Sequence, residues 1–285
     1  MADIQSFRSA WGLRPGSDLP RPDAQSRGFR TNTGCESDIQ EQSPYELIGQ
    51  YRAWVALSYV PNSVAQACLE PGLSLDPPPG TPMGQHPILY SFGRHYGVHP
   101  RFFELWSYDY NEAIMGLCNV RFRHADGSYS GPYFRFATVR LDNLLANEIG
   151  VALGLPKKMA DFETTSGTYF FRMPEDREPL FQGHFVLDGD AFTADLPNFQ
   201  TIEPFMNQPV ISRSITGEWI VTDFFIDYQH AAMTPMRSEI LVRDDSLLGL
   251  AAGRHVFATL RDTPINGMYR SVHCWRMSPP TPLRK

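Results

Sequence analysis

Short runs in which apolar and polar residues alternate dominate the middle of this chain and constrain its fold more than any other feature. Residues 133–140, Tyr-Phe-Arg-Phe-Ala-Thr-Val-Arg, show the pattern clearly. A period of two is typical of a strand that buries one face. Turn-forming segments such as 125–128 (Ala-Asp-Gly-Ser) and 187–190 (Leu-Asp-Gly-Asp) separate the runs. The runs interpreted as strands are 51–60, 88–92, 102–108, 119–123, 133–140, 168–172, 184–188, 191–195, 209–215, 218–228, 239–243, 255–260 and 268–275.

Helical periodicity is sparse and is confined to residues 63–68, 142–153 and 245–252. In the second of these segments Asp142 is the expected N-cap. The apolar side of that helix is expected to carry Leu144, Leu145, Ile149 and Leu153. The sequence therefore predicts an α+β protein that is mostly antiparallel β, with a few short helices.

Composition favours one large domain with flexible ends. Residues 1–45 are rich in Ser, Gly, Pro, Asp, Gln and Arg and lack apolar periodicity, so we interpret them as a loosely ordered N-terminal arm. Residues 279–285 contain three prolines and are interpreted as a tail. Between them, residues 46–278 of this 285-residue chain, which is 42% hydrophobic overall, can build one sizeable core.

Charge and cysteine usage exclude several classes of protein. Twenty-five basic against 31 acidic residues give a net charge of −6, which argues against a nucleic-acid partner. No apolar run approaches the roughly 20 residues needed to cross a bilayer, and the first residues do not resemble a secretory signal. The four cysteines (Cys35, Cys68, Cys118 and Cys274) lie far apart, without a Cys-x-x-Cys motif. We expect a cytoplasmic protein with no membrane partner.

His95-x-x-x-His99, followed by Glu104, has the spacing of a metal site on a helix. Gly97 and Pro100, however, predict a turn at this segment rather than a helix. We therefore expect no metal ligands here and no metal site in the protein.

Lysine is rare in this chain, and two of its three lysines are adjacent. Lys157 and Lys158 lie in an apolar stretch, residues 153–160 (Leu-Gly-Leu-Pro-Lys-Lys-Met-Ala), whereas Lys285 ends the chain. One interpretation is a pair of exposed lysines at a turn after a helix. The other is a reactive amine that forms a Schiff base with a carbonyl compound, which then acts as an electron sink.

A nucleophilic lysine has to lose its proton, and an ordinary lysine titrates at about 10.4. Burial in an apolar pocket favours the neutral amine, and so does a second ammonium nearby. Adjacent side chains point to opposite faces of a strand and diverge on a helix, so both lysines cannot easily enter one pocket. We therefore expect desolvation to lower the pKa of the lysine more than the charge of the neighbouring lysine does.

Residues 155–160 (Leu-Pro-Lys-Lys-Met-Ala) resemble the aromatic-Pro-Lys-Lys-Leu-Ala/Gly signature of the acetoacetate decarboxylase family. The segment Tyr110-Asn-Glu-Ala113 resembles the family's Tyr-x-Glu segment, which supplies an active-site glutamate. Leu141-Asp-Asn143 is similar to a Leu-Asp-Asn stretch that precedes the lysines. The resemblance extends over about residues 46–276, including the first strand and the helix that follows it.

This resemblance implies curved sheets that form a cone-like or barrel-like body around an apolar pocket, assembled as a homo-oligomer without a cofactor. It implies that Lys157 is the Schiff-base lysine and that Lys158 is the neighbouring cation. Glu112 would position the substrate or transfer a proton, Tyr110 would contact the substrate, and Arg52 would attract its carboxylate. The expected partner is a small oxo acid.

The sequence departs from the family where Gly-Arg-Glu precedes the Pro-Lys-Lys motif. Here residues 148–154 read Glu-Ile-Gly-Val-Ala-Leu-Gly, and Glu148 is the candidate replacement for the glutamate. Three functions remain open. The first is decarboxylation of a β-keto acid, and the second is an aldolase–dehydratase or cyclase reaction of secondary metabolism that uses the same lysine. The third is binding of a small molecule without turnover.

Overall fold

The computed structural model describes residues 46–101, 105, 107–165, 168–172, 181–187, 208–226, 233–242, 253–257 and 268–283. The predicted arm, the predicted strand 191–195 and the predicted helix 245–252 lie outside these residues, as does Glu104. Within the described part of the chain, no helix is long and apolar enough to cross a membrane.

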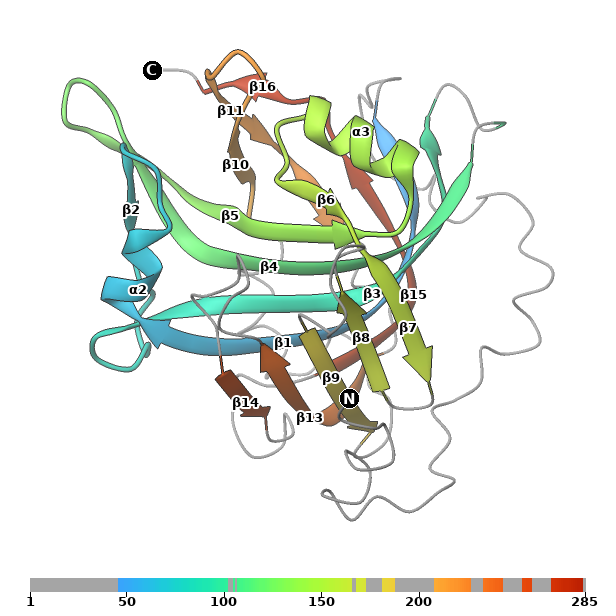
Figure 1. Ribbon diagram of the computed structural model, residues 1–285. Helices are drawn as coiled ribbons and strands as arrows, with labels where there is room; N and C mark the ends of the chain where they lie inside the picture. Colours follow the sequence, from blue (N-terminus) through green and yellow to red (C-terminus); the bar gives the residue numbers. More distant parts are fainter. Residues whose placement is uncertain are drawn as a thin grey trace.

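Four long strands form the centre of the structure and run side by side as curved ribbons (Figure 1). They are β1 (Leu47–Pro61), β3 (Gln85–Pro100), β4 (Tyr108–Arg123) and β5 (Tyr129–Leu141), and each pairs with the next in antiparallel register. Each has 13 to 16 residues, so each is longer than the short alternating run that predicted it. Apolar side chains on both faces explain the difference, because a strand buried on two sides loses its clean alternation.

The remaining strands extend this sheet along one path. Its order is β16-β11-β10-β5-β4-β3-β1-β15-β13-β9-β8-β7, and all neighbours on it are antiparallel except β10 and β5. Because this path has two ends, the described strands do not close into a barrel. Mostly antiparallel β structure is confirmed. The other strands are β2 (Leu73–Leu75), β6 (Lys157–Met159), β7 (Asp161–Thr165), β8 (Thr168–Arg172), β9 (Phe181–Leu187), β10 (Val210–Arg213), β11 (Trp219–Thr222), β12 (Phe224–Ile226), β13 (Met233–Val242), β14 (Gly253–Phe257), β15 (Met268–Met277) and β16 (Thr281–Pro282).

Two helices occur in the described residues, α2 (Asn62–Ala67) and α3 (Leu144–Ala152). The N-cap of α3 is Asn143, not Asp142 as predicted, because the Asn143 side chain accepts a hydrogen bond of 3.0 Å from the backbone N–H of Ala146. The Asp142 carboxylate instead accepts from the backbone N–H and the side-chain amide of Asn111, at 2.8 and 2.6 Å. The predicted apolar side is also wrong at its start, since Leu144 is 64% exposed.

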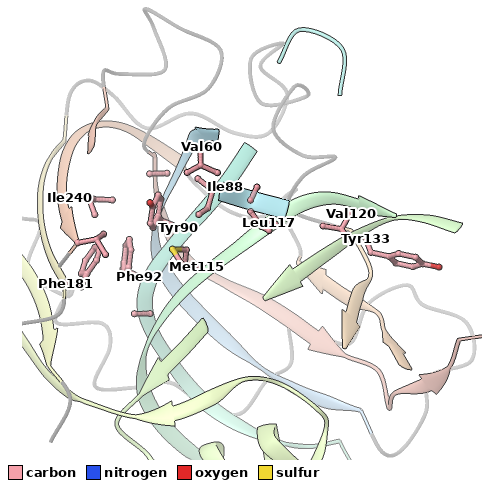
Figure 2. Packing of buried hydrophobic residues seen from close by; sticks show 14 of the residues in the cluster. Val60, Ile88, Tyr90, Phe92, Met115, Leu117, Val120, Tyr133, Phe181 and Ile240 are labelled. Carbon is pink, nitrogen blue, oxygen red and sulfur yellow. The ribbon is translucent and has the colours of Figure 1, made fainter. Parts of the chain in front are cut away.

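The two faces of the central sheet bury separate apolar clusters. Figure 2 shows the first, in which Tyr90, Phe92 and Met115 of the central strands meet Phe181 of β9 and Ile240 of β13. Phe92 stacks on Phe181 with ring centroids 4.2 Å apart. The second cluster lies on the opposite face and continues into a pocket. The period-two pattern therefore positions alternate residues of β1, β3, β4 and β5 toward the pocket.

The turn predicted at Gly97 and Pro100 is not present. Strand β3 continues to Pro100 through an irregularity between His95 and Val98, where Gly97 adopts a positive φ of 56°. Such a bulge adds a residue and bends the strand without ending it. As a result His95 stays in the sheet, on its buried face.

Residues 279–285, expected from the sequence to be a tail, contribute to the sheet where they are described. Thr281 and Pro282 form β16, which pairs with Val221 and Ile220 of β11. The backbone N–H of Leu283 also donates to the carbonyl of Trp219 at 2.9 Å.

Candidate active site

A pocket opens on the second face of the central sheet, between the long strands and α3. The space between its lining residues, together with the open solvent at its mouth, amounts to about 950 Å³. Most of its wall is aliphatic or aromatic, and the charged side chains gather at one place, whereas Gln208 lies farther along, beside β4, where it is hydrogen-bonded to Asn119. The lining residues are Leu47, Tyr51, Leu89, Ser91, His95, Val98, Tyr108, Tyr110, Glu112, Ile114, Phe134, Phe136, Val139, Ala146, Ile149, Gly150, Leu153, Leu155, Lys157, Gln208, Val210, Phe224, Trp275 and Met277.

The short strand β6 positions Lys157 in this pocket. The chain leaves α3 through Gly154, whose φ is +76° and whose added Cβ would meet the backbone oxygen of Arg213 at 2.3 Å, so only glycine fits there. It then pairs in parallel with β5, with Lys157 opposite Val139. Lys157 has 9% of its side chain exposed, whereas Lys158 is exposed on the other face of the strand. This divergence agrees with the two-residue period of a strand.

The Lys157 ammonium binds a buried carboxylate. Its Nζ donates to Oε1 of Glu112 at 3.0 Å, and Oε2 of Glu112 lies 2.9 Å from Nε2 of His95. Glu112 is 4% exposed and His95 is 2% exposed. An ionised carboxylate only accepts hydrogen bonds, so Nε2 of His95 carries the hydrogen in this arrangement. The three side chains form a continuous polar cluster from three strands, β3, β4 and β6.

Electrostatics keep Glu112 ionised. Burial alone would raise the pKa of its carboxyl, but the charge of Lys157, the interaction with His95 and their hydrogen bonds outweigh it and lower this pKa to about 2. A carboxyl with such a pKa is an anion at neutral pH. Glu112 is therefore suited to hold a cation or accept hydrogen bonds, not to donate a proton.

Aromatic rings fix the orientation of the His95 imidazole. Tyr51 stacks on one face with centroids 4.1 Å apart, and Tyr110 stacks on the other at 4.4 Å. Trp275 contacts the imidazole edge-on at 5.2 Å, and the hydroxyl groups of Tyr51 and Ser91 lie 3.0 Å apart. The imidazole therefore has little rotational freedom, and its bond to Glu112 is held by packing.

Sequence reasoning missed His95 and Tyr51 as members of this cluster. Tyr51 is opposite His95 across β1 and β3, and His95 is opposite Tyr110 across β3 and β4. The three rings thus form one row across the sheet. Of the three, only Tyr51 lies in a run predicted as a strand, residues 51–60. The sequence gives no further signal, because strand pairing brings the rings together and is not encoded locally.

Tyr110 lies beside the lysine. Its ring centroid is 5.2 Å from Nζ of Lys157, within the range of a cation–π contact. Burial, and then the charge of Glu112, raise the pKa of Tyr110 well above the ordinary value, and the same causes raise that of Tyr108 to about 12. Both phenols are neutral at physiological pH and can donate hydrogen bonds.

The structure brings Lys157, Glu112 and Tyr110 together and leaves the other residues singled out from sequence outside the pocket. Arg52 follows Tyr51 on β1, is absent from the lining and has its guanidinium 5.8 Å from the ring centroid of Tyr96. Glu148 is exposed on α3. Among the residues that the structure describes, no group of His, Cys, Asp and Glu is arranged to hold a metal ion.

Gly150 makes room for the side chain of Lys157. An added Cβ at this position of α3 would lie 2.1 Å from Cδ of Lys157. In an ordinary helix, replacing glycine by alanine stabilises the protein by about 1 kcal/mol. Here we expect Gly150→Ala to displace Lys157 from Glu112 and to lower the rate of lysine labelling by a ketone by about tenfold or more. Reductive trapping of a ketone by both proteins measures this rate, and Val151→Ala, an exposed site on the same helix, is the control.

Comparison with known proteins supports the fold assignment. No protein-family model and no curated protein sequence matches the chain. Solved structures do match: the enduracididine biosynthesis enzyme MppR in complex with pyruvate has 13% identity and a TM-score of 0.58, covering 87% of this chain and 93% of that one. An acetoacetate decarboxylase-like enzyme from Sphingomonas wittichii has 14% identity and a TM-score of 0.57, covering 86% and 95%. Acetoacetate decarboxylase from Legionella pneumophila has 14% identity and a TM-score of 0.54, covering 87% and 92%.

Proposed function

The chain has the fold of the acetoacetate decarboxylase-like superfamily, and we propose that it is an enzyme that forms a Schiff base between Lys157 and the carbonyl carbon of an oxo acid. The observation that carries this proposal is a lysine that enters an apolar pocket while its Nζ is bound to a buried carboxylate. A structural ion pair does not require an open pocket around its amine. A reactive amine does, because a substrate carbon has to reach it.

The first reaction that this site supports is decarboxylation of a β-keto acid. The Lys157 ammonium first releases a proton to water. The lone pair of the neutral amine then attacks the ketone carbon, and loss of water from the carbinolamine gives an iminium ion. The bond between the α-carbon and the carboxylate then breaks, carbon dioxide leaves, and the electron pair moves to the iminium nitrogen. Protonation of the resulting enamine and hydrolysis by water release the ketone and regenerate Lys157.

The composition of the pocket favours loss of the carboxylate. Lys157 and His95 are the only basic residues among the described residues that line it. A carboxylate in such an apolar site loses hydration, and this cost disappears when it leaves as neutral carbon dioxide. The positive iminium nitrogen on Lys157 lies next to the bond that breaks and accepts its electrons.

Glu112 and His95 have separate roles in this proposal. Glu112, which is ionised, holds the ammonium before reaction and the iminium afterwards. His95 keeps Glu112 in place, and histidine is the side chain that ordinarily changes protonation near neutral pH. His95, held between Tyr51 and Tyr110, is thus a positioning residue.

Variants at His95 test this role. We expect His95→Phe, which keeps an aromatic ring between Tyr51 and Tyr110, to lower kcat by roughly 10²-fold. Since His95 is one of the groups that lower the pKa of Glu112, we also expect the acid limb of the pH–rate profile to move to higher pH. His95→Gln keeps an N–H donor for Glu112 and is expected to recover part of kcat. Steady-state kinetics from pH 5 to 9 separate the two variants. Equal kcat and an unchanged profile in His95→Phe would show that the ring has only a packing role.

A second reaction is supported by one comparison. The enzyme MppR, which has the same fold, is also known in complex with the condensation product of pyruvate and imidazole 4-carboxaldehyde, with 11% identity and a TM-score of 0.58. In this chain an iminium of pyruvate on Lys157 would lose a methyl proton to give an enamine. The enamine carbon would attack an aldehyde, and loss of water would give an enone.

Product analysis distinguishes these reactions. Release of one carbon dioxide per ketone from a β-keto acid supports decarboxylation. An enone from pyruvate and an aldehyde, without gas, supports the aldolase–dehydratase reaction. Thermal stabilisation by oxo acids with no product, unchanged in Lys157→Ala, would instead indicate a binding protein.

A further inference from the structure

The polar cluster occupies only the middle of the pocket. Along β4, Glu112 is followed by the pocket-lining Ile114 and then by Gly116, which lies four residues, or about 13 Å, from Glu112. Leu89 of β3 and Phe136 of β5 lie on either side of Gly116 and also line the pocket. The wall beyond the lysine is therefore mostly apolar over a distance longer than a four-carbon acid. Its polar side chains there already have protein partners: Ser91 contacts the Tyr51 hydroxyl, and Gln208 is hydrogen-bonded to Asn119.

Two aromatic rings, those of Phe134 and Phe136, lie at this apolar end of the pocket. Phe134 and Phe136 pack edge to face, with ring centroids 5.0 Å apart and planes at 80°. Gly116 makes the packing feasible, since an added Cβ there would lie 2.2 Å from the Phe134 ring. Phe136 is only half-buried, so part of its ring faces open space in the pocket. Val139, three residues along β5, is the partner of Lys157, so the lysine and this ring share one wall.

Trp275 and Phe224 bound the opposite end of the pocket. Trp275 is stacked by Phe224 at 5.3 Å and contacts His95 with its edge, and it is 4% exposed. Toward Phe136, a group attached to a carbonyl at Lys157 meets Leu89 and Ile114, which also line the pocket.

On the basis of the proposed imine chemistry, we propose that the substrate is a 3-oxo acid that carries an aryl or long alkyl group, and not acetoacetate itself. The ketone carbon bonds to Nζ of Lys157, and the carboxylate lies beside the iminium. The aryl or alkyl group lies against Leu89, Ile114 and Phe136. Each molecule loses one carbon dioxide, gains one proton at the α-carbon and leaves as a methyl ketone.

A matched pair of β-keto acids tests this substrate class. Acetoacetate and 3-oxo-5-phenylpentanoate share the same reacting atoms and differ in the apolar group. With cyanoborohydride present, we expect the phenyl acid to label Lys157 at a half-saturating concentration at least about tenfold lower. Calorimetry of the two product ketones, 4-phenylbutan-2-one and acetone, measures binding without turnover and is expected to show the same order.

A pair of variants locates the apolar group. Leu89→Trp fills the space beside Gly116 and is expected to remove most of the preference for the phenyl acid while acetoacetate is still trapped. Leu241→Trp, at an exposed leucine of β13, is the control and should keep the preference. Equal trapping of both acids by the unmodified protein would overturn the proposed substrate class and leave the imine chemistry standing. Absence of any adduct, with equal binding of both ketones, would overturn both.

Discussion

Replacing Lys157 by alanine is expected to lower turnover by on the order of 10⁴-fold, because no other group in the described pocket can form an imine. The change also leaves Glu112 buried without its ammonium partner, so some loss of stability is expected as well. Lys157→Arg separates the two effects. A guanidinium keeps the positive charge beside Glu112 but stays protonated and cannot form a Schiff base. Steady-state assays, with circular dichroism to check folding, compare the variants.

Lys158→Ala is the companion variant. Lys158 is exposed on the opposite face of β6, away from the pocket, so we expect this variant to keep at least about a tenth of the turnover. If turnover fell as much as in Lys157→Ala, this would support the role of neighbouring cation that the sequence predicts for Lys158. Turnover in Lys157→Arg close to that of the unmodified protein would contradict the imine mechanism.

Replacing Glu112 by glutamine is expected to change how stability depends on pH. The pKa of Glu112 falls from an ordinary 4.5 to about 2 in the folded protein, since Lys157 and His95 outweigh the opposing effect of burial. A group with a lowered folded pKa stabilises the protein above its unfolded pKa, and this stability is lost as the pH falls through the folded value. The stabilisation is on the order of 3 kcal/mol. It should be fully present at pH 6 and decline between pH 4.5 and 2.

Urea denaturation at several pH values measures this effect. The unmodified protein should lose stability below pH 4.5 more steeply than Glu112→Gln, which has no carboxyl to titrate at this position. At pH 7 the glutamine variant should be less stable, because the buried ammonium of Lys157 then faces a neutral amide. Parallel pH curves for the two proteins would show that Glu112 is not held ionised by its neighbours.

The class of fold was predicted from local pattern, because period-two alternation indicates strands. The lysine pair stood out by its rarity, and the resemblance to the acetoacetate decarboxylase family pointed to Glu112 and Tyr110, which the structure brings beside Lys157. Strand β6 was not predicted. It has three residues, and its pairing with β5 depends on a parallel neighbour that only the tertiary structure supplies.

His95 and Arg52 are two residues whose positions the sequence predicted wrongly. The sequence predicts a turn at His95 because Gly97 follows it. In the structure a bulge lets β3 continue and keeps the imidazole on the buried face. Arg52 was chosen by register with a related strand, where an offset of one residue moves a side chain to the opposite face. Tyr51 takes the pocket-facing position instead.

The central claim, imine formation at Lys157, is tested most directly by borohydride trapping followed by peptide mapping. The chain has only three lysines, so the reduced adduct can be assigned without ambiguity. With a panel of β-keto acids and pyruvate, we expect a mass increase equal to the substrate fragment on the peptide containing Lys157, and no such increase in Lys157→Arg. An adduct on Lys158 or Lys285 alone, or no adduct on a folded protein with any of these acids, would contradict the proposed function.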